Sequence, residues 1–154
     1  MVIILHSSTV FFFNLIKQGF MAFSDTYRLS SHAVITNNQG QVLLLKANYG
    51  QKSWGLPGGA LDKGETIHQA LLRECQEELN CEVDIVYLSG VYYHTAFNSH
   101  AFIFRAHLPN DAQIVLSNEH TEYAYFAIDE LSAVQKERVL DCLNFTNDVV
   151  SKVF

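Results

Sequence analysis

Three glutamates lie close together in one short segment, Arg73-Glu74-Cys75-Gln76-Glu77-Glu78. The segment falls inside a predicted helix over residues 66–79, because Thr66 is a suitable N-cap and Gln69, three residues later, completes a capping box. Asn80 follows at the position where the helix must end. The helix therefore determines how the three carboxylates are presented.

The predicted helix has an apolar stripe, and the glutamates border it. At roughly 100° per residue, the residues of the stripe are Ile67, Leu71, Cys75 and Leu79. On this wheel Glu78 falls between Ile67 and Leu71, and Glu74 and Glu77 lie just beside them. Carboxylates next to a core cost several kcal/mol unless they are neutralised, paired or bound to a metal.

A divalent Mg²⁺ ion would remove this cost, because it is a hard cation that takes oxygen ligands and bridges carboxylates to substrate phosphates. The helix would then be a metal platform. The alternative is a solvated acidic patch, in which Glu74, Glu77 and Glu78 pair with Arg73 or with a lysine elsewhere. The wheel by itself leaves both interpretations open.

The spacing of the charged residues resembles the signature of the Nudix (MutT-like) hydrolase family, GX5EX7REUXEEXGU, in which U is a bulky aliphatic residue. Gly59 begins the match, and the preceding run Trp54-Gly55-Leu56-Pro57-Gly58 is similar to the one that commonly leads into the signature. All its charged positions are present, at Glu65, Arg73, Glu74, Glu77 and Glu78. So many fixed positions make the match specific.

Three positions depart from the family pattern. Asn80 stands where glycine is usual, at a helix end that favours the left-handed conformation, which asparagine tolerates next best. Cys75 and Cys81 replace bulky aliphatic residues, and a buried cysteine behaves as a small hydrophobe. We therefore interpret these cysteines as structural thiols rather than nucleophiles.

The resemblance implies a role for each matching position. Glu74, Glu77 and Glu78 would bind Mg²⁺, with Mn²⁺ as a substitute, and Gly58 would offer its backbone carbonyl. The residues implied in catalysis are Glu65, Arg73, Glu78 and Glu119. Of these, Glu65 would support metal binding or pair with Arg73, and Arg73 would orient its neighbours. Glu119 precedes an aromatic segment and would be a further ligand or the general base; the alternative is an ordinary exposed acid.

The implied reaction is metal-dependent hydrolysis of a diphosphate linkage in a nucleoside diphosphate that is joined to another moiety. Mg²⁺ would offset the charge of the diphosphate and activate a water for in-line attack on phosphorus, while a glutamate takes the proton. One alternative is a Nudix-fold module that binds a nucleotide without cleaving it. Another is a prenyl diphosphate isomerase on the same fold, for which no set of protonating residues is recognisable.

The substrate is a small, nucleotide-like molecule whose identity the signature does not specify. Nucleoside triphosphates, ADP-ribose-like compounds and capped RNA ends are all compatible with it. Arg28, Tyr93 and Phe97 are the candidate substrate contacts, although aromatic residues on strands more often belong to the core.

The remaining elements predict a mixed α/β (α+β) fold. The resemblance implies that this fold is the Nudix-type α/β/α sandwich, with a mixed central sheet, the loop and helix of the signature, and a C-terminal helix. Residues 28–36 and 42–45 are expected to form a hairpin around the turn at 37–40. Further strands are predicted at 83–93, 101–108 and 123–128. Helical spacing of apolar residues runs through the tail, residues 129–150.

Composition sets the broad class of the protein. With 154 residues, one domain over residues 21–154 is expected, and residues 1–20 are interpreted as a dispensable or non-native extension. A net charge of −6 argues against duplex DNA and anionic membranes as partners. Three cysteines without metal-finger spacing favour free thiols and a cytoplasmic location. A homodimer is compatible with a domain of this size.

Overall fold

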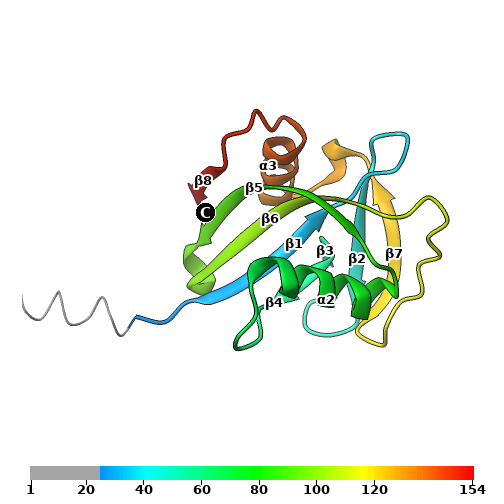
Figure 1. Cartoon of the computed structure of the whole chain (residues 1–154), viewed down its shortest axis with the longest axis horizontal. Coiled ribbons are helices and arrows are strands. Elements are labelled where there is room, and N and C mark those ends of the chain that lie inside the picture. Colours follow the sequence, from blue (N-terminus) through cyan, green and yellow to red (C-terminus); the bar gives the residue numbers. More distant parts are fainter. Residues whose placement is uncertain (1–24) are drawn as a thin grey trace, which may run out of the picture.

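Two β-sheets form the centre of the structure, a computed structural model that describes residues 25–154 (Figure 1). The larger sheet has the strand order β4-β1-β6-β5-β8, with bounds Gly58–Ala60, Arg28–Val34, Ser99–His107, Asp84–His94 and Val150–Val153. The smaller sheet has the order β3-β2-β7, with bounds Trp54–Gly55, Val42–Ala47 and His120–Phe126. The prediction for residues 1–20 lies outside the described residues.

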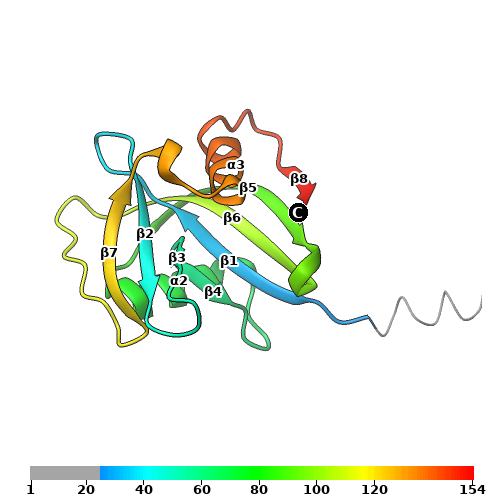
Figure 2. The same ribbon diagram turned by 180° about the vertical axis from the view of Figure 1, so that it is seen from behind.

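The larger sheet is mixed, whereas the smaller one is antiparallel. Strand β1 runs parallel to β6, and β5 runs parallel to β8, while the β1–β4 and β5–β6 pairs are antiparallel. Strand β2 pairs with β3 and β7 in antiparallel fashion. Figure 2 shows β2 and β7 side by side at the end of the molecule opposite β8.

Each of the two α-helices within residues 25–154 packs against a different hydrophobic core. Helix α2 (Ile67–Leu79) contributes Leu71, Cys75 and Leu79 to one core, and helix α3 (Ala133–Leu143) contributes Val139 and Cys142 to the other. Alternate residues of the central strands divide between the two cores. The first core takes Ala33, Ile35, Leu43, Leu45, Phe104 and Ala106, and the second takes Val34, Val42, Leu44, Ala101 and Ile103. Continuous apolar runs therefore lie between two buried layers, as in sheets covered on both faces.

This arrangement confirms the predicted α/β/α architecture and the predicted helix. The Thr66 side chain accepts a hydrogen bond from the backbone N–H of Gln69, whose side chain in turn accepts one from the N–H of Thr66. Asn80 ends α2 in the left-handed conformation, with φ of 53°. These caps are local, which is why the sequence alone was sufficient to place them.

The predicted hairpin of residues 28–36 and 42–45 is present only next to its turn, and the prediction was wrong for the rest of the two strands. Strands β1 and β2 meet at the turn through a bridge between Thr36 and Val42 and a 2.9 Å hydrogen bond from Leu43 N to Ile35 O. Beyond this point they separate into different sheets, because β1 pairs with β4 and β6 whereas β2 pairs with β3 and β7.

The predicted C-terminal helix was too long. The tail forms a 3₁₀ turn, η2 (Ile128–Glu130), then α3, and finally strand β8. Ser132 caps α3 and Asn144 ends it, so the apolar spacing that continues to Val150 belongs to a strand. A second 3₁₀ turn, η1 (Thr95–Phe97), joins β5 to β6.

The three cysteines are free and buried, which confirms the prediction of thiols. Cys75 and Cys142 are completely covered, and burial raises the pKa of both thiols. Within residues 25–154, neither α-helix combines the length and the apolar character required to cross a bilayer.

Candidate active site

Arg73 connects the middle of α2 to the loop that precedes the helix. Its Nε lies 2.7 Å from Glu65 Oε1, and its Nη2 lies 2.9 Å from Glu65 Oε2. The same guanidinium donates to Glu74 Oε1 at 2.8 Å and to the carbonyl of Ala60 at 2.9 Å. Arg73 thereby fixes the position of two carboxylates relative to strand β4.

The pairing has a marked electrostatic effect. The hydrogen bond from Arg73, helped by one from the backbone N–H of Asp62, lowers the pKa of Glu65 to about 2. The same contact raises the pKa of Arg73. Both groups are therefore permanently charged at neutral pH, as expected of partners that position other residues.

Glu78 is the buried acid of the group. Only 6% of the residue is exposed, and its Oε2 accepts a 2.7 Å hydrogen bond from the backbone N–H of Gly58. Burial raises the pKa of Glu78 to about 8, although the Gly58 hydrogen bond opposes the shift and the charges of Glu74 and Glu119 add to it. The wheel predicted that Glu78 would border the core, and the structure confirms that position.

His120 faces the other oxygen of Glu78. Its Nε2 lies 3.6 Å from Glu78 Oε1, and the two side chains are each 8% exposed. Burial lowers the pKa of His120, while the charge of Glu119 opposes that shift. Both shifts favour the uncharged forms of the Glu78–His120 pair.

The loop before β7 is attached to the C-terminal end of α2, which brings His120 to this place. The backbone N–H of Val115 donates to the carbonyl of Leu79 at 3.0 Å, and that of Ser117 donates to the carbonyl of Glu78 at 3.4 Å. The free carbonyls at a helix end are thus satisfied by the loop. Glu119 lies on the exposed side of the same loop, near enough for its charge to raise the pKa of Glu74 and Glu78.

Two glycines allow strand β4 to approach these acids. Gly58 has φ of +121°, and a Cβ added there would lie 2.1 Å from the carbonyl oxygen of Ser31. A Cβ added at Gly59 would lie 2.6 Å from the carboxylate of Glu74. Larger residues at either position would displace β1 or the Glu74 carboxylate.

The carboxylates of α2 form a gradient from buried to exposed. The side-chain exposures of Glu78, Glu74 and Glu77 are 8%, 15% and 60%. Burial raises the pKa of Glu74, the contacts with Arg73 oppose the shift, and the charges of Glu77 and Glu119 add to it. Among residues 25–154, no three acidic, histidine or cysteine side chains converge closely enough to hold an ion by themselves. Mg²⁺ does not require such a cage, because it commonly keeps water and phosphate oxygens among its ligands.

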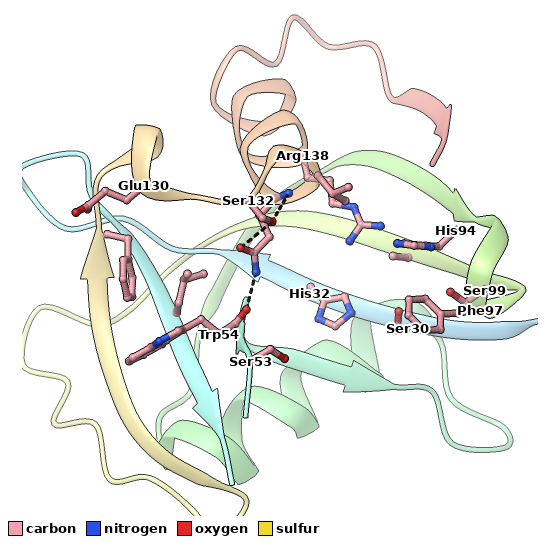
Figure 3. Close-up of a pocket in the computed structure, with 15 residues that line it drawn as sticks. Ser30, His32, Ser53, Trp54, His94, Phe97, Ser99, Glu130, Ser132 and Arg138 are labelled. Atoms are coloured by element: carbon pink, nitrogen blue, oxygen red, sulfur yellow. Dashed lines mark hydrogen bonds between the residues drawn. The ribbon is translucent and has the colours of Figure 1, made fainter. Parts of the chain in front are cut away.

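Two cavities adjoin at His32 and Ser53, and Glu78 lines the smaller one. The smaller, of about 240 Å³, is lined by Gly58, Glu78 and His120. The larger, of about 790 Å³, extends toward α3 and is lined by Trp54 and Arg138 among others (Figure 3). His32 and Ser53 line both cavities. A ligand can therefore place one end near Glu78 and the other under α3.

His32 lines both cavities and is partly buried. Burial, followed by the charge of Arg138, lowers the pKa of His32 to about 4, and a hydrogen bond with the backbone of Leu56 only partly opposes the shift. The imidazole is therefore neutral at physiological pH.

A family model described as NUDIX domain matches residues 26–143. This chain belongs to the Nudix family. A MutT-like protein of Streptomyces ambofaciens is 32% identical over 123 residues, which cover 77% of this chain and 78% of that protein. An RNA pyrophosphohydrolase of Vibrio atlanticus is 53% identical over 55 residues, which cover 36% of this chain and 31% of that protein. The match thus spans about a third of the length of that relative.

Solved structures show the same fold. An ADP-ribose pyrophosphatase from Streptococcus suis superposes with a TM-score of 0.67 at 18% identity, over 84% of this chain and 100% of that chain. The Nudix fold predicted from the signature is thereby confirmed.

The structure brings together most of the residues that the Nudix signature singled out. Arg73 contacts Glu65, Glu74 and Glu77, and Gly58 separately holds Glu78 through its backbone N–H. Glu119 lies at its exposed edge.

The three candidate substrate contacts lie in different places. Phe97 is in the wall of the larger cavity. Tyr93 lies outside that cavity, where its hydroxyl donates to Asn98 Oδ1 at 2.8 Å and its ring contacts Tyr27. Arg28 is exposed at the start of β1, outside the walls of both cavities. Of the three, only Phe97 therefore lines the larger cavity, and none lines the smaller cavity beside Glu78.

Sequence reasoning did not single out His32, Ser53, His120 or Arg138. His120 directly follows Glu119, which was the one local signal for it. The other three reach the cavities from β1, the loop before β3, and α3, and their proximity depends on how the sheets are assembled.

Proposed function

We propose that this Nudix chain is a hydrolase that cleaves a diphosphate linkage in a small, nucleotide-like molecule. One observation carries the proposal: the buried carboxyl of Glu78 lines a small cavity that shares His32 and Ser53 with a much larger one. A diphosphate fits beside the acids, and a nucleoside or similar group fits in the larger space, which falls within the usual range for small-molecule sites.

The residues present suit a divalent cation. The charges of Glu77 and Glu119 raise the pKa of Glu74, and those of Glu74 and Glu119 raise the pKa of Glu78, so negative charge is concentrated at one place. Arg73 contacts several acids at once, and its single positive charge does not neutralise their combined negative charge. Glu74, Glu77, Glu78 and the carbonyl of Gly58 would hold Mg²⁺. When bound, Mg²⁺ would supply Lewis-acid activation of the phosphate and of the attacking water.

The chain's own residues would position the reacting groups. The backbone N–H of Gly58 holds one oxygen of Glu78, and Arg73 holds Glu74. His120 is placed to exchange a proton with Glu78, across 3.6 Å. Glu119, at the exposed edge, is a second candidate for receiving the proton of the attacking water.

The names of the matched proteins suggest which substrates to test. The matched proteins include an RNA pyrophosphohydrolase and an ADP-ribose pyrophosphatase. We therefore extend the proposal to a nucleoside diphosphate joined to another moiety, with nucleoside triphosphates and RNA 5′ ends as further candidates.

The proposal is tested by measuring products over a panel of these compounds with Mg²⁺, with Mn²⁺ and with a chelator. Wild type is compared with Glu78→Gln, which keeps the shape of the side chain but cannot bind a metal as a carboxylate. Glu82→Gln, at an exposed acid just after α2, is the matched control. We expect Glu78→Gln and the chelator each to reduce turnover by at least about 100-fold, while Glu82→Gln leaves it unchanged.

Binding of these compounds without turnover would contradict the proposal. If several of them raised the melting temperature of wild type and none was cleaved under any metal, the chain would be a nucleotide-binding module instead.

A further inference from the structure

Arg138 extends from α3 over the larger cavity (Figure 3). Its guanidinium lies 5.3 Å from the ring centre of Tyr92 and 5.3 Å from that of Phe154. Both aromatic faces hold the group in place through cation–π contacts. The side chain is therefore fixed at the edge of the cavity rather than free to reach solvent.

Within residues 25–154, the guanidinium of Arg138 makes no hydrogen bond and no ion pair. Its Nε is buried without a partner. Asp141, the acid one turn further along α3, is already engaged by Lys152 at 2.7 Å and by the hydroxyl of Tyr92 at 2.9 Å. Burial lowers the pKa of Arg138, which indicates that its charge is poorly solvated.

No other lysine or arginine of the described chain lines this cavity, and its one acid, Glu130, accepts a hydrogen bond from the backbone N–H of Ala127. His32 does not add charge, since its imidazole is neutral at physiological pH. Ser30 and Ser99 contribute hydroxyls to the wall. A fixed guanidinium with free N–H groups prefers a planar or tetrahedral oxyanion, which it binds through two parallel hydrogen bonds.

We propose that Arg138 binds a second anionic group of the substrate, a phosphate or a carboxylate on the part that occupies the larger cavity. This inference rests on the proposed hydrolase function. The cleaved diphosphate lies beside Glu78, His32 and Ser53 form the boundary, and the second anion lies beyond them under α3. The chain thus selects nucleotides that carry negative charge at both ends.

The test uses pairs of compounds that differ by one anionic group. NADPH and NADH differ by a 2′-phosphate, adenosine 3′-phosphate 5′-triphosphate and ATP differ by a 3′-phosphate, and UDP-glucuronate and UDP-glucose differ by a carboxylate. The ratio of kcat/KM within each pair is measured for wild type, Arg138→Met, Arg138→Lys and Lys136→Met. Lys136 is on the same helix but outside the cavity wall, where it pairs with Asp129, so it controls for loss of a positive charge.

We expect wild type to favour the more charged member of at least one pair by about tenfold or more. Arg138→Met should reduce that ratio to about one, Arg138→Lys should retain part of it, and Lys136→Met should leave it unchanged. The pair that responds identifies the source of the anion.

Equal loss of kcat/KM on both members of every pair would overturn the proposal and assign Arg138 a packing role. Melting temperatures with each compound provide a second readout that needs no turnover. If no compound is cleaved but the more charged member stabilises wild type more than Arg138→Met, the hydrolase proposal fails and the anion site stands. If neither readout distinguishes the members of a pair, the anion site fails whether or not hydrolysis occurs.

Discussion

Arg73 forms a bidentate ion pair with Glu65, with Nε 2.7 Å from Oε1 and Nη2 2.9 Å from Oε2. This contact joins the loop before α2 to the middle of the helix and holds the pKa of Glu65 near 2. A carboxylate held so firmly in its charged form is a poor proton acceptor at neutral pH. We infer that the pair acts by positioning Glu74, which shares the same guanidinium.

Arg73→Lys is expected to reduce kcat by about 10- to 100-fold, because lysine keeps the charge but cannot hold Glu65 and Glu74 at once. KM should change little, because the substitution leaves the residues that line the two cavities in place. The pH–rate profile should keep its position, since neither member of the pair titrates near neutrality. A shifted profile in Arg73→Lys would contradict this inference and indicate that Glu65, or Glu74, whose pKa the Arg73 contacts also lower, takes part in proton transfer.

Three glycines, Gly55 of β3 and Gly58 and Gly59 of β4, give a graded alanine series. Gly58→Ala should destabilise the fold by about 3 kcal/mol or more, because its Cβ would strike the backbone of β1 and its φ is +121°. Gly59→Ala should fold nearly as well as wild type but lose most activity, since its Cβ would move only the carboxylate of Glu74. Gly55→Ala is the control for stability alone, because no atom lies within 4 Å of its Cβ but Gly55 lines the smaller cavity.

Denaturant unfolding and kcat/KM separate the members of this series. Full activity in Gly59→Ala would show that the position of Glu74 is not critical. A stable Gly58→Ala would show that β1 and β4 can move apart without penalty.

Local sequence was enough to predict α2, its caps and the burial of Glu78. The capping box of Thr66 and Gln69 and the left-handed end at Asn80 depend on neighbours within a few residues. The spacing from Gly59 to Glu78 similarly lies within one loop and one helix. These local features determine where most of the acidic side chains of the site lie.

Long-range assembly was beyond local patterns. The apolar runs of β1 and β2 are as compatible with a hairpin as with two separate sheets, and only the pairing with β6 and β7 decides between them. The approach of His120 to Glu78 and of Arg138 to the larger cavity depends on the same assembly. The C-terminal residues show the same limit of local patterns, because Val150 continues the helical spacing of apolar residues but lies in a strand that pairs with β5.

The partly buried imidazole of His32, whose pKa is lowered, predicts a pH dependence of stability. Its folded pKa of about 4 lies below its ordinary value of 6.5, so the folded state binds the proton less readily than the unfolded chain. The contribution of His32 is therefore complete above about pH 6.5 and is lost as the pH falls toward 4. Between about pH 7 and pH 4.5, wild type should lose roughly 2 to 3 kcal/mol of unfolding free energy from this group.

Urea unfolding of wild type and His32→Gln at both pH values measures this contribution, because glutamine is neutral throughout. The difference between the two proteins should change by that amount, whereas His107→Gln, at an exposed histidine of β6, should track wild type. A constant difference between wild type and His32→Gln would show that the cavity wall admits the charged imidazole.

Asn80 is expected to be a site of suboptimal stability. It ends α2 with φ of 53°, a conformation that a residue with a Cβ adopts at some cost. Asn80→Gly should raise the free energy of unfolding by up to about 1 kcal/mol, and Asn80→Ala should lower it by about 1 kcal/mol, because alanine lacks the side chain that tolerates this conformation. Activity should be unaffected in both, since the Asn80 side chain is exposed and lies outside the walls of both cavities. Thermal unfolding with parallel turnover assays tests both statements. A loss of activity in the stabilised Asn80→Gly variant would contradict the second one. It would show that the conformation of Asn80 at the end of α2 affects how the loop that bears His120 approaches Glu78.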